Sequence, residues 1–233
     1  MDYIFEGFTQ AFYLIKALDA ELLAIVLLSL EVSLGALCVA SFAAIPFGVA
    51  LGLKQFPFRR LLLSIVNTCV GLPPVVVGLF VFLFLSRSGP FGSLALLYTP
   101  TAMVIAQIIL AFPIVASLVQ AAVAGVDPQV RLTALTLGAT PRQADRMVVC
   151  EARTGIIAAL VAGYGRLAAE VGAILIVGGN IAGTTRVMTT TIAMEADKGN
   201  FELALALGIV LITISLVING VLSVLQHQGR RAS

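Results

Sequence analysis

Long stretches of this chain contain no charged residue, and this feature limits its fold more than any other. Between Val32 and Val126 the only charged residues are Lys54, Arg59, Arg60 and Arg87. Over the whole chain 60% of residues are apolar and 11% are charged, whereas soluble domains average roughly 45–50% and about 25%. A water-soluble fold is therefore excluded, and the sequence predicts an all-helical integral membrane protein that crosses the bilayer several times.

Five apolar runs are long enough to be membrane spans. A helix needs roughly 20 apolar residues to cross the hydrocarbon core, and the runs of this length occupy residues 22–53, 61–85, 101–124, 154–177 and 203–225. The first run exceeds one straight crossing, and its Glu31 is expected either near the headgroups or against protein. Each proline within a span removes a backbone hydrogen bond, so we expect kinks at Pro46, Pro73, Pro74 and Pro113.

We divide the chain into three parts. Residues 1–21 form an N-terminal amphipathic segment, 22–227 form the transmembrane domain with a cytoplasmic loop at about 126–153, and 228–233 form a tail. In the first part the large apolar side chains recur mostly at three- and four-residue spacing: Phe5, Phe8, Phe12, Ile15 and Leu18. This spacing favours a helix that lies on the membrane surface or packs on the first span. No basic region precedes it, so we expect no cleavable signal.

The basic residues between the spans predict the orientation in the membrane. With the N-terminus outside, the cytosolic segments hold nine basic residues: Lys54, Arg59, Arg60, Arg131, Arg142, Arg146, Arg153, Arg230 and Arg231. The outer side holds four: Lys16, Arg87, Arg186 and Lys198. Because basic residues favour the cytoplasmic side, the N-terminus is predicted outside and the C-terminus inside.

The cytoplasmic loop is patterned as two short helices. Asp127 is suited to cap a helix that Pro128 opens, and Gly138 is expected to end it. Thr140 and Gln143 then have the spacing of a capping box, which starts a second helix. A helix-turn-helix that reads DNA has a similar pattern, but a position between two membrane spans argues against that interpretation.

We interpret the loop as a rigid projection that docks on a cytosolic partner, the alternative being a folded connector without a partner. The residues expected to form the contact are Thr133, Ala134, Leu137, Gly138, Ala139, Thr140 and Arg142.

The same loop resembles that of the membrane-spanning subunits of ATP-binding-cassette importers. Their motif is Glu-Ala-Ala, three residues, Gly, nine residues and Ile-x-Leu-Pro; Ala134 and Gly138 match it strictly, and Leu132 stands at the position of the glutamate. This departure removes the acidic contact that the motif would supply.

Further stretches resemble one branch of that family. Residues Gly71–Gly92 and Glu170–Ile192 are similar to the sulfate, molybdate and tungstate permeases, and TRVMTT at Thr185–Thr190 is most similar to the tungstate-type members. The resemblance covers about residues 22–227. It implies a type I importer (MetI-like) fold with five spans in a bacterial cytoplasmic membrane, and alternating-access import of an oxyanion, with tungstate first and molybdate or sulfate as alternatives. It also implies a homodimer, two cytosolic ATPase subunits and an external oxyanion-binding protein.

Two charged residues are expected inside the fourth span. Arg166 and Glu170 lie four residues apart, so on one helix they share a face and neutralise each other where a lone charge would be costly. The pair either lines the translocation pathway or orders the dimer core. In the pathway, it would present a nearly neutral surface to a passing anion.

The segment after the fourth span has a composition suited to oxyanions. Residues 178–191 combine glycine and asparagine with threonine and arginine, and amide N–H groups, hydroxyls and guanidinium groups bind tetrahedral anions. The candidate pathway residues in it are Asn180, Thr184, Thr185 and Arg186. The alternative is a turn that contacts the external binding protein.

The sequence argues against chemistry by the chain itself. No lysine belongs to a phosphate-binding P-loop, so ATP must be hydrolysed by partner subunits and no cofactor is expected in this chain. His227 is the only histidine and lies in the tail, which removes Ser/His or Cys/His catalysis and the commoner zinc sites. Cys38, Cys69 and Cys150 are interpreted as small apolar residues rather than metal ligands.

Three other classes of protein fit poorly. A net charge of +2 does not build a nucleic-acid groove. Gly163, Gly165 and Ala168 fit a dinucleotide-binding pattern but no strand precedes them, so they indicate helix packing. A self-contained secondary transporter would need internal repeats and more coupling charges than Glu31, Arg166 and Glu170.

Overall fold

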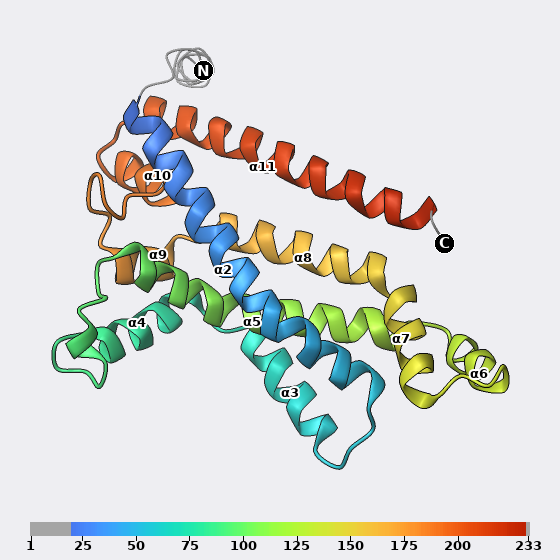
Figure 1. The fold of residues 1–233 in the computed structure, drawn as a ribbon. Helices are drawn as coiled ribbons and strands as arrows, with labels where there is room; N and C mark the ends of the chain where they lie inside the picture. Colours follow the sequence, from blue (N-terminus) through green and yellow to red (C-terminus); the bar gives the residue numbers. More distant parts are fainter. Residues whose placement is uncertain (1–19, 232–233) are drawn as a thin grey trace.

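A computed structural model of the chain describes the backbone of residues 20–231 and the side chains of residues 20–221. Every regular element in this range is helical (Figure 1). The elements are α2 (Ala20–Leu53), α3 (Arg59–Val70), α4 (Pro74–Leu85), η1 (Gly92–Leu94), α5 (Pro100–Ala124), α6 (Pro128–Thr136), α7 (Pro141–Glu151), α8 (Arg153–Ala168), α9 (Gly172–Gly178), α10 (Met188–Asp197) and α11 (Phe201–Arg231). Residues 1–19 of the predicted amphipathic segment lie outside the described residues.

Three helices are long and apolar enough to cross a membrane by themselves. They are α2, α5 and the part of α11 up to Val221, and they coincide with the first, third and fifth predicted spans. Two bent pairs, α3 with α4 and α7 with α8, raise the number to five if each pair is one span. Pro46 and Pro113 lie inside α2 and α5, which continue past them as single helices.

The second predicted span is not one helix. Its residues form α3 and α4, whose axes differ by 96°, so the kink expected at Pro73 and Pro74 is a sharp break in the helix. The break falls at Gly71, Leu72 and Pro73, and Pro73 has an extended ψ of 125°. Two consecutive prolines cause it, because a proline disfavours the helical conformation of the residue before it and lacks a backbone donor.

The fourth predicted span is also interrupted. Helix α8 ends at Ala168 and α9 begins at Gly172, so Arg166 and Glu170 do not lie on one continuous helix as expected. Two side chains, one from α5 and one within the break, bind backbone groups that the break frees. Gln107 donates from Nε2 to the Leu167 carbonyl at 3.3 Å, and Ala173 N–H donates to the Glu170 carboxylate at 3.1 Å.

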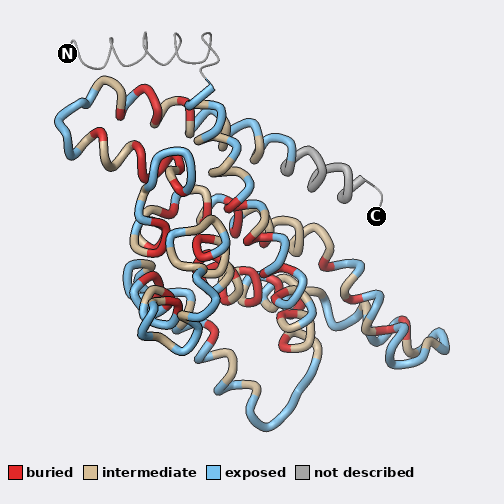
Figure 2. Tube along the Cα trace, turned by 60° about the vertical axis from the view of Figure 1, so that its left-hand side comes forward, coloured by how far each residue is buried: buried red, intermediate tan, exposed pale blue. Residues whose placement is uncertain are grey.

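Helix α5 is the centre of the fold, since α2, α3, α4, α8 and α9 all pack against it. Figure 2 shows the buried residues gathered in the interior of this bundle and the exposed ones along its outer helices and loops. The outer surface is apolar, with Phe42 88% and Leu216 68% exposed. A bilayer, rather than water, is the solvent that such a surface requires.

Gly48 and Gly52 of α2 lie at close range to α5. A Cβ atom at Gly48 would lie 2.6 Å from the Ala116 carbonyl oxygen, and one at Gly52 would lie 2.7 Å from Val123 Cγ1. The two glycines therefore let α2 lie directly on α5. The hairpin of α6 and α7 projects from one end of this bundle, away from the segments between α4 and α5 and between α9 and α10 (Figure 1).

Candidate functional site

The projecting hairpin is built by local capping, as the sequence predicts. The Asp127 carboxylate accepts a hydrogen bond from Gln129 N–H at 2.9 Å. Thr140 and Gln143 form the predicted capping box, in which Thr140 N–H donates to Gln143 Oε1 at 2.8 Å and Gln143 N–H donates to Thr140 Oγ1 at 3.4 Å. Both helices of the hairpin thus begin at fixed residues.

The turn between the two helices is equally well defined. Gly138 has φ +89°, and its N–H donates to the Leu135 carbonyl at 3.0 Å while Ala139 N–H donates to the Ala134 carbonyl at 3.0 Å. These two bonds form a Schellman motif, which requires the left-handed conformation that glycine adopts without strain. Gly138 ends the first helix of the hairpin, in agreement with the prediction.

The inner face of the hairpin is packed and cross-linked. Ala134, Ala144 and Val148 are buried, and Arg131 Nε donates to Asp145 Oδ1 at 2.8 Å across the two helices. Ala134 is only 3% exposed, so the expectation that its side chain lies on the contact surface is wrong. Its methyl group fills the space between the helices.

The outer face of the hairpin carries exposed side chains. Leu137 is 83% exposed at the turn; Thr133, Gly138, Thr140 and Arg142 are also exposed, and Ala139 is half-buried. Leu132 and Met147, each 52% exposed, are further exposed apolar side chains of the hairpin and were not predicted as contact residues. The surface, defined by Leu132, Leu137 and Met147, is called the hairpin apex below. Exposed apolar side chains on a rigid projection are typical of a docking surface.

Arg166 and Glu170 meet despite the interruption between α8 and α9. Arg166 Nη1 lies 2.8 Å from Glu170 Oε2. The two side chains have different surroundings, because that of Arg166 is 40% exposed and that of Glu170 is 3% exposed. The Glu170 carbonyl also accepts a hydrogen bond from Thr189 Oγ1 at 2.9 Å. Glu170 therefore joins α8, α9 and α10, and leaves one edge of the Arg166 guanidinium open.

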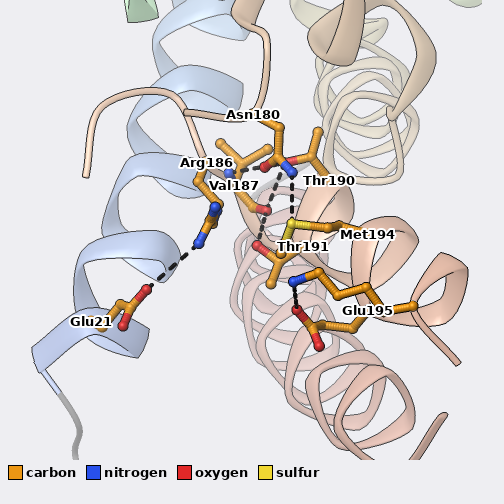
Figure 3. Close-up of polar contacts among 9 residues, drawn as sticks. Glu21, Asn180, Arg186, Val187, Thr190, Thr191, Met194 and Glu195 are labelled. Carbon is orange, nitrogen blue, oxygen red and sulfur yellow. Dashed lines mark hydrogen bonds and ion pairs between the residues drawn. The ribbon is translucent and has the colours of Figure 1, made fainter. Parts of the chain in front are cut away.

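The threonine-rich segment forms a second cluster, at the start of α10 (Figure 3). Thr185 is fully buried; its Oγ1 donates to the Gly178 carbonyl at 2.6 Å and accepts from Ile181 N–H at 3.0 Å. Thr190 Oγ1 binds Asn180 Oδ1 at 2.9 Å, and Asn180 Nδ2 lies 3.4 Å from Met194 Sδ. These groups fasten the loop to α10. The expectation that Thr185 presents a free hydroxyl to an anion is wrong.

Arg186 lies at the edge of this cluster. Its Nη1 is 3.7 Å from Glu21 Oε1 on α2 (Figure 3), and its Nε is buried with no acceptor among the described residues. Thr184 is exposed beside it. Arg186 and Thr184 are thus the members of the predicted set whose polar groups reach the surface.

Two polar residues of the site were missed by sequence reasoning. Gln107 is fully buried in α5 and binds the end of α8, while Ser29 Oγ accepts from Met188 N–H at 2.9 Å and so ties α2 to α10. A buried glutamine in an apolar helix was a visible signal, because such a group requires a partner. Ser29 gave no such signal, because a serine in a helix can bond to the backbone of its own helix as readily as to another element.

Comparisons with known proteins agree with this architecture. Residues 44–230 match the model of the family described as binding-protein-dependent transport system inner membrane component. The chain is 40% identical over 228 residues to the tungstate uptake system permease protein TupB of Peptoclostridium acidaminophilum, covering 98% of this chain and 100% of that protein.

Two further comparisons reach a second relative and a solved structure. A probable anion ABC transporter permease protein of Haloferax volcanii is 43% identical over 203 residues, covering 85% of this chain and 88% of that one. In the crystal structure of a bacterial alginate ABC transporter in complex with a pentasaccharide-bound periplasmic protein, one chain matches with a TM-score of 0.68 and 22% identity. The match covers 92% of this chain and 80% of that chain, and at this identity it shows the fold.

Proposed function

The chain belongs to the family of binding-protein-dependent transport system inner membrane components, and on that premise we propose that it is the subunit through which an ATP-driven importer carries tungstate into the cell. The family places it in the inner membrane as a multi-pass permease that is not itself catalytic. The choice of tungstate follows the relative named for tungstate uptake, which aligns with 98% of this chain. Molybdate and sulfate are the alternatives.

The observation that carries the proposal is the α6–α7 hairpin. It projects beyond the bundle (Figure 1), and its caps, Schellman turn and Arg131–Asp145 bridge give it a fixed shape. We assign the hairpin apex, together with Thr133, Ala139, Thr140 and Arg142, to a cytosolic ATPase subunit. Ala134 packs beneath this surface, and Gly138 makes the turn at which Leu137 is exposed.

The hairpin is coupled directly to the charged pair. Only Ala152 separates α7 from α8, and hydrogen bonds continue through it, from Ala152 N–H to the Val148 carbonyl and from Ile156 N–H to the Ala152 carbonyl, each 2.9 Å. A displacement of the hairpin by ATP binding therefore tilts α8 and moves Arg166 at its far end.

We assign Arg166 and Glu170 to the translocation pathway between two copies of the chain. The exposed edge of Arg166 attracts an oxyanion, and Glu170, fixed at 2.8 Å, prevents the guanidinium from holding it tightly. Asn180 and Thr185 shape the outer entrance from within the loop, and Thr184 and Arg186 offer it a hydroxyl and a positive charge. An external binding protein selects the anion.

Docking of the hairpin is tested with Leu137→Asp. The matched control is Leu94→Asp, because Leu94 is 57% exposed in η1, at the opposite end of the molecule. The permease is purified with the ATPase subunit, and tungstate uptake is measured in vesicles that contain the external binding protein. Leu137→Asp is expected to insert in the membrane but to lose the ATPase, whereas Leu94→Asp retains it. Retention of the ATPase by Leu137→Asp would contradict the proposed docking surface.

Substrate and energy source are tested in the same vesicles. We expect ATP-dependent uptake of tungstate at concentrations at which molybdate and sulfate are not taken up. Uptake of either alternative in preference to tungstate would reassign the substrate. Uptake by the purified chain without any ATPase would favour a secondary transporter and overturn the proposal.

A further inference from the structure

Helix α3 carries a polar face that is exposed although the helix forms part of a candidate membrane span. Arg60, Ser64, Asn67 and Thr68 recur at spacings of three and four residues, so they lie along one side of the helix. All four are exposed in the structure. These four residues are called the α3 polar face below. On other sides of the helix Val66 is buried, and Ile65 is 49% exposed.

The contact between α3 and α5 puts this face at the depth of a candidate membrane span. Asn67 Oδ1 accepts a hydrogen bond from Ser117 Oγ of α5 at 3.0 Å, and Ser117 lies seven residues before the cytosolic end of α5 at Ala124. At 1.5 Å per residue, Asn67 is therefore about 10 Å inside that end. Helices α3 and α4 have 12 residues each and are about 18 Å long, so neither crosses the roughly 30 Å hydrocarbon core alone.

The polar groups of this face need a polar environment. The bond from Ser117 holds the Asn67 carbonyl oxygen toward α5, and the Asn67 amide nitrogen donates to no group among the described residues. Thr68 Oγ1 donates back to the Ser64 carbonyl at 2.8 Å. Arg60 forms no ion pair within residues 20–221, and residues 32–126 contain no acidic side chain. Facing hydrocarbon, the amide would remain unpaired, which is costly.

We infer that the α3 polar face lines the cytosolic half of the translocation pathway, where the Asn67 amide and the Arg60 guanidinium donate hydrogen bonds to the passing oxyanion. This inference rests on the proposed function and adds to it a second wall, built from residues outside the predicted site. Amide and guanidinium donors without a nearby carboxylate suit a divalent oxyanion. Arg60, at the cytosolic end of the face, draws the anion toward the exit.

The experiment compares cysteine substitutions on two sides of α3 in the complete complex with its ATPase and binding protein. Cys38, Cys69 and Cys150 are first replaced by alanine, and uptake by this background is confirmed. Ser64→Cys and Asn67→Cys are then compared with Ile65→Cys, which lies on the same helix, is also exposed in the single chain, and is expected to face lipid. The probe is a charged, membrane-impermeant thiol reagent, which reacts with the thiolate and therefore requires water.

The expected result is that Ser64→Cys and Asn67→Cys react at least about tenfold faster than Ile65→Cys, because a thiol in hydrocarbon does not ionise. Labelled Asn67→Cys should lose uptake, and tungstate supplied with ATP should slow its labelling. Equal reaction at Ile65→Cys would instead place α3 in the headgroup region. Absence of reaction at Ser64→Cys and Asn67→Cys would mean that protein covers the face, and normal uptake after labelling of Asn67→Cys would remove the face from the pathway; each result overturns the inference.

The two proposals fail separately. If the background complex takes up molybdate rather than tungstate, the proposed substrate is wrong, while the labelling pattern, repeated with that anion, still tests the α3 polar face. If tungstate uptake is ATP-dependent but the two sides of α3 react alike, the proposed function stands and the inference falls.

Discussion

Arg166 and Glu170 carry opposite unit charges, but the side chain of Glu170 is buried and that of Arg166 is partly exposed. This difference in exposure determines how much stability each substitution removes. Arg166→Gln leaves the Glu170 carboxylate, 3% exposed, without its counter-ion, which costs roughly 3–5 kcal/mol for a buried pair. Glu170→Gln leaves a cation that is 40% exposed and partly solvated, and we expect a loss of about 1 kcal/mol. Thermal unfolding of the purified permease in detergent measures both.

The double variant Arg166→Gln/Glu170→Gln is the control for this pair. It removes both charges, so it should be more stable than Arg166→Gln alone, which a double-mutant cycle detects as coupling. Equal destabilisation by the two single substitutions would show that the burial of Glu170 does not matter. In uptake assays Glu170→Gln should reduce transport while the ATPase remains bound; normal uptake would remove Glu170 from the mechanism.

Glu195, at the junction between α10 and α11, is expected to make the stability of the protein depend on pH. Its carboxylate accepts hydrogen bonds from Lys198 Nζ at 2.9 Å and Asn200 Nδ2 at 3.1 Å. The Lys198 hydrogen bond is the main cause that lowers the pKa of Glu195 below its ordinary value of 4.5. A lowered folded-state pKa means that the stabilisation is complete above 4.5 and is lost as the pH falls through the folded value.

Glu195→Gln is therefore expected to be less stable than the parent at pH 7, and the difference should shrink as the pH falls below 4.5. Unfolding curves of both proteins in detergent between pH 7 and pH 3 measure this. A difference that stays constant over the range would mean that the carboxylate charge contributes nothing at this corner.

At the level of helices, the contact between α2 and α5 depends on residues without side chains. Gly48→Ala should destabilise the protein by roughly 1–3 kcal/mol, because its Cβ would lie 2.6 Å from a backbone oxygen and 2.9 Å from Val119 Cβ. Gly35→Ala, on the same helix, is the control, since no atom lies within 4 Å of its Cβ; we expect no loss, or a gain of up to about 1 kcal/mol. Unfolding of the two variants, measured side by side, tests the contact, and equal effects would refute it.

The elements also show which features a sequence of this kind reveals. The caps at Asp127, Thr140 and Gly138 were predictable because each is made by residues within five positions of one another. The direction of the chain after Pro73 was not predictable, because a pair of prolines predicts a break in the helix but not the angle of the bend. The end of α8 depends on Gln107, 60 residues away, and on a hydrogen bond from Thr189, so local pattern predicted one continuous span there.

The candidate site divides in the same way. The proximity of Arg166 and Glu170 was predictable from their spacing, and it survives the break because four residues of chain still hold them together. The hydrogen bonds that Thr185 and Asn180 form within the protein were not predictable. Threonine and asparagine use the same side-chain groups to bind an anion and to bind the protein's own backbone. Only the fold shows which groups are already occupied.

Across the whole molecule, the two interrupted spans are joined to each other. A Cβ atom at Gly78 of α4 would lie 2.8 Å from Ala173 Cα of α9, and one at Gly172 would lie 2.7 Å from Val75 Cγ2. The short helices that follow the two breaks are therefore packed backbone to backbone, and a tilt of α8 that moves α9 must also move α4. The hairpin, Arg166 and the α3–α4 bend thus belong to one mechanical unit.

The α3–α4 bend can be interpreted in two ways, as one bent crossing or as a re-entrant segment. The two interpretations place the α6–α7 hairpin on opposite sides of the membrane. If the bent pair is one crossing, the loop at 54–58 is cytosolic and the loop at 86–99 is external, so the α6–α7 hairpin returns to the cytosol after α5. If the pair is instead a re-entrant segment, both loops lie on one side and the hairpin is external. The basic residues Lys54, Arg59 and Arg60 at the first loop, against Arg87 at the second, favour the crossing.

Cysteine substitutions in the same alanine background distinguish the two topologies. An impermeant thiol reagent added outside intact cells should label Ser93→Cys and should leave Gln55→Cys and Gln143→Cys unlabelled until the membrane is opened. Gln143 is exposed on the hairpin, so permeabilised cells provide the positive control for its reactivity. Labelling of Gln143→Cys from outside would place the hairpin beyond the reach of any cytosolic ATPase. Because the hairpin links that ATPase to α8 and the charged pair, the proposed coupling would then be impossible, whatever anion the protein carries.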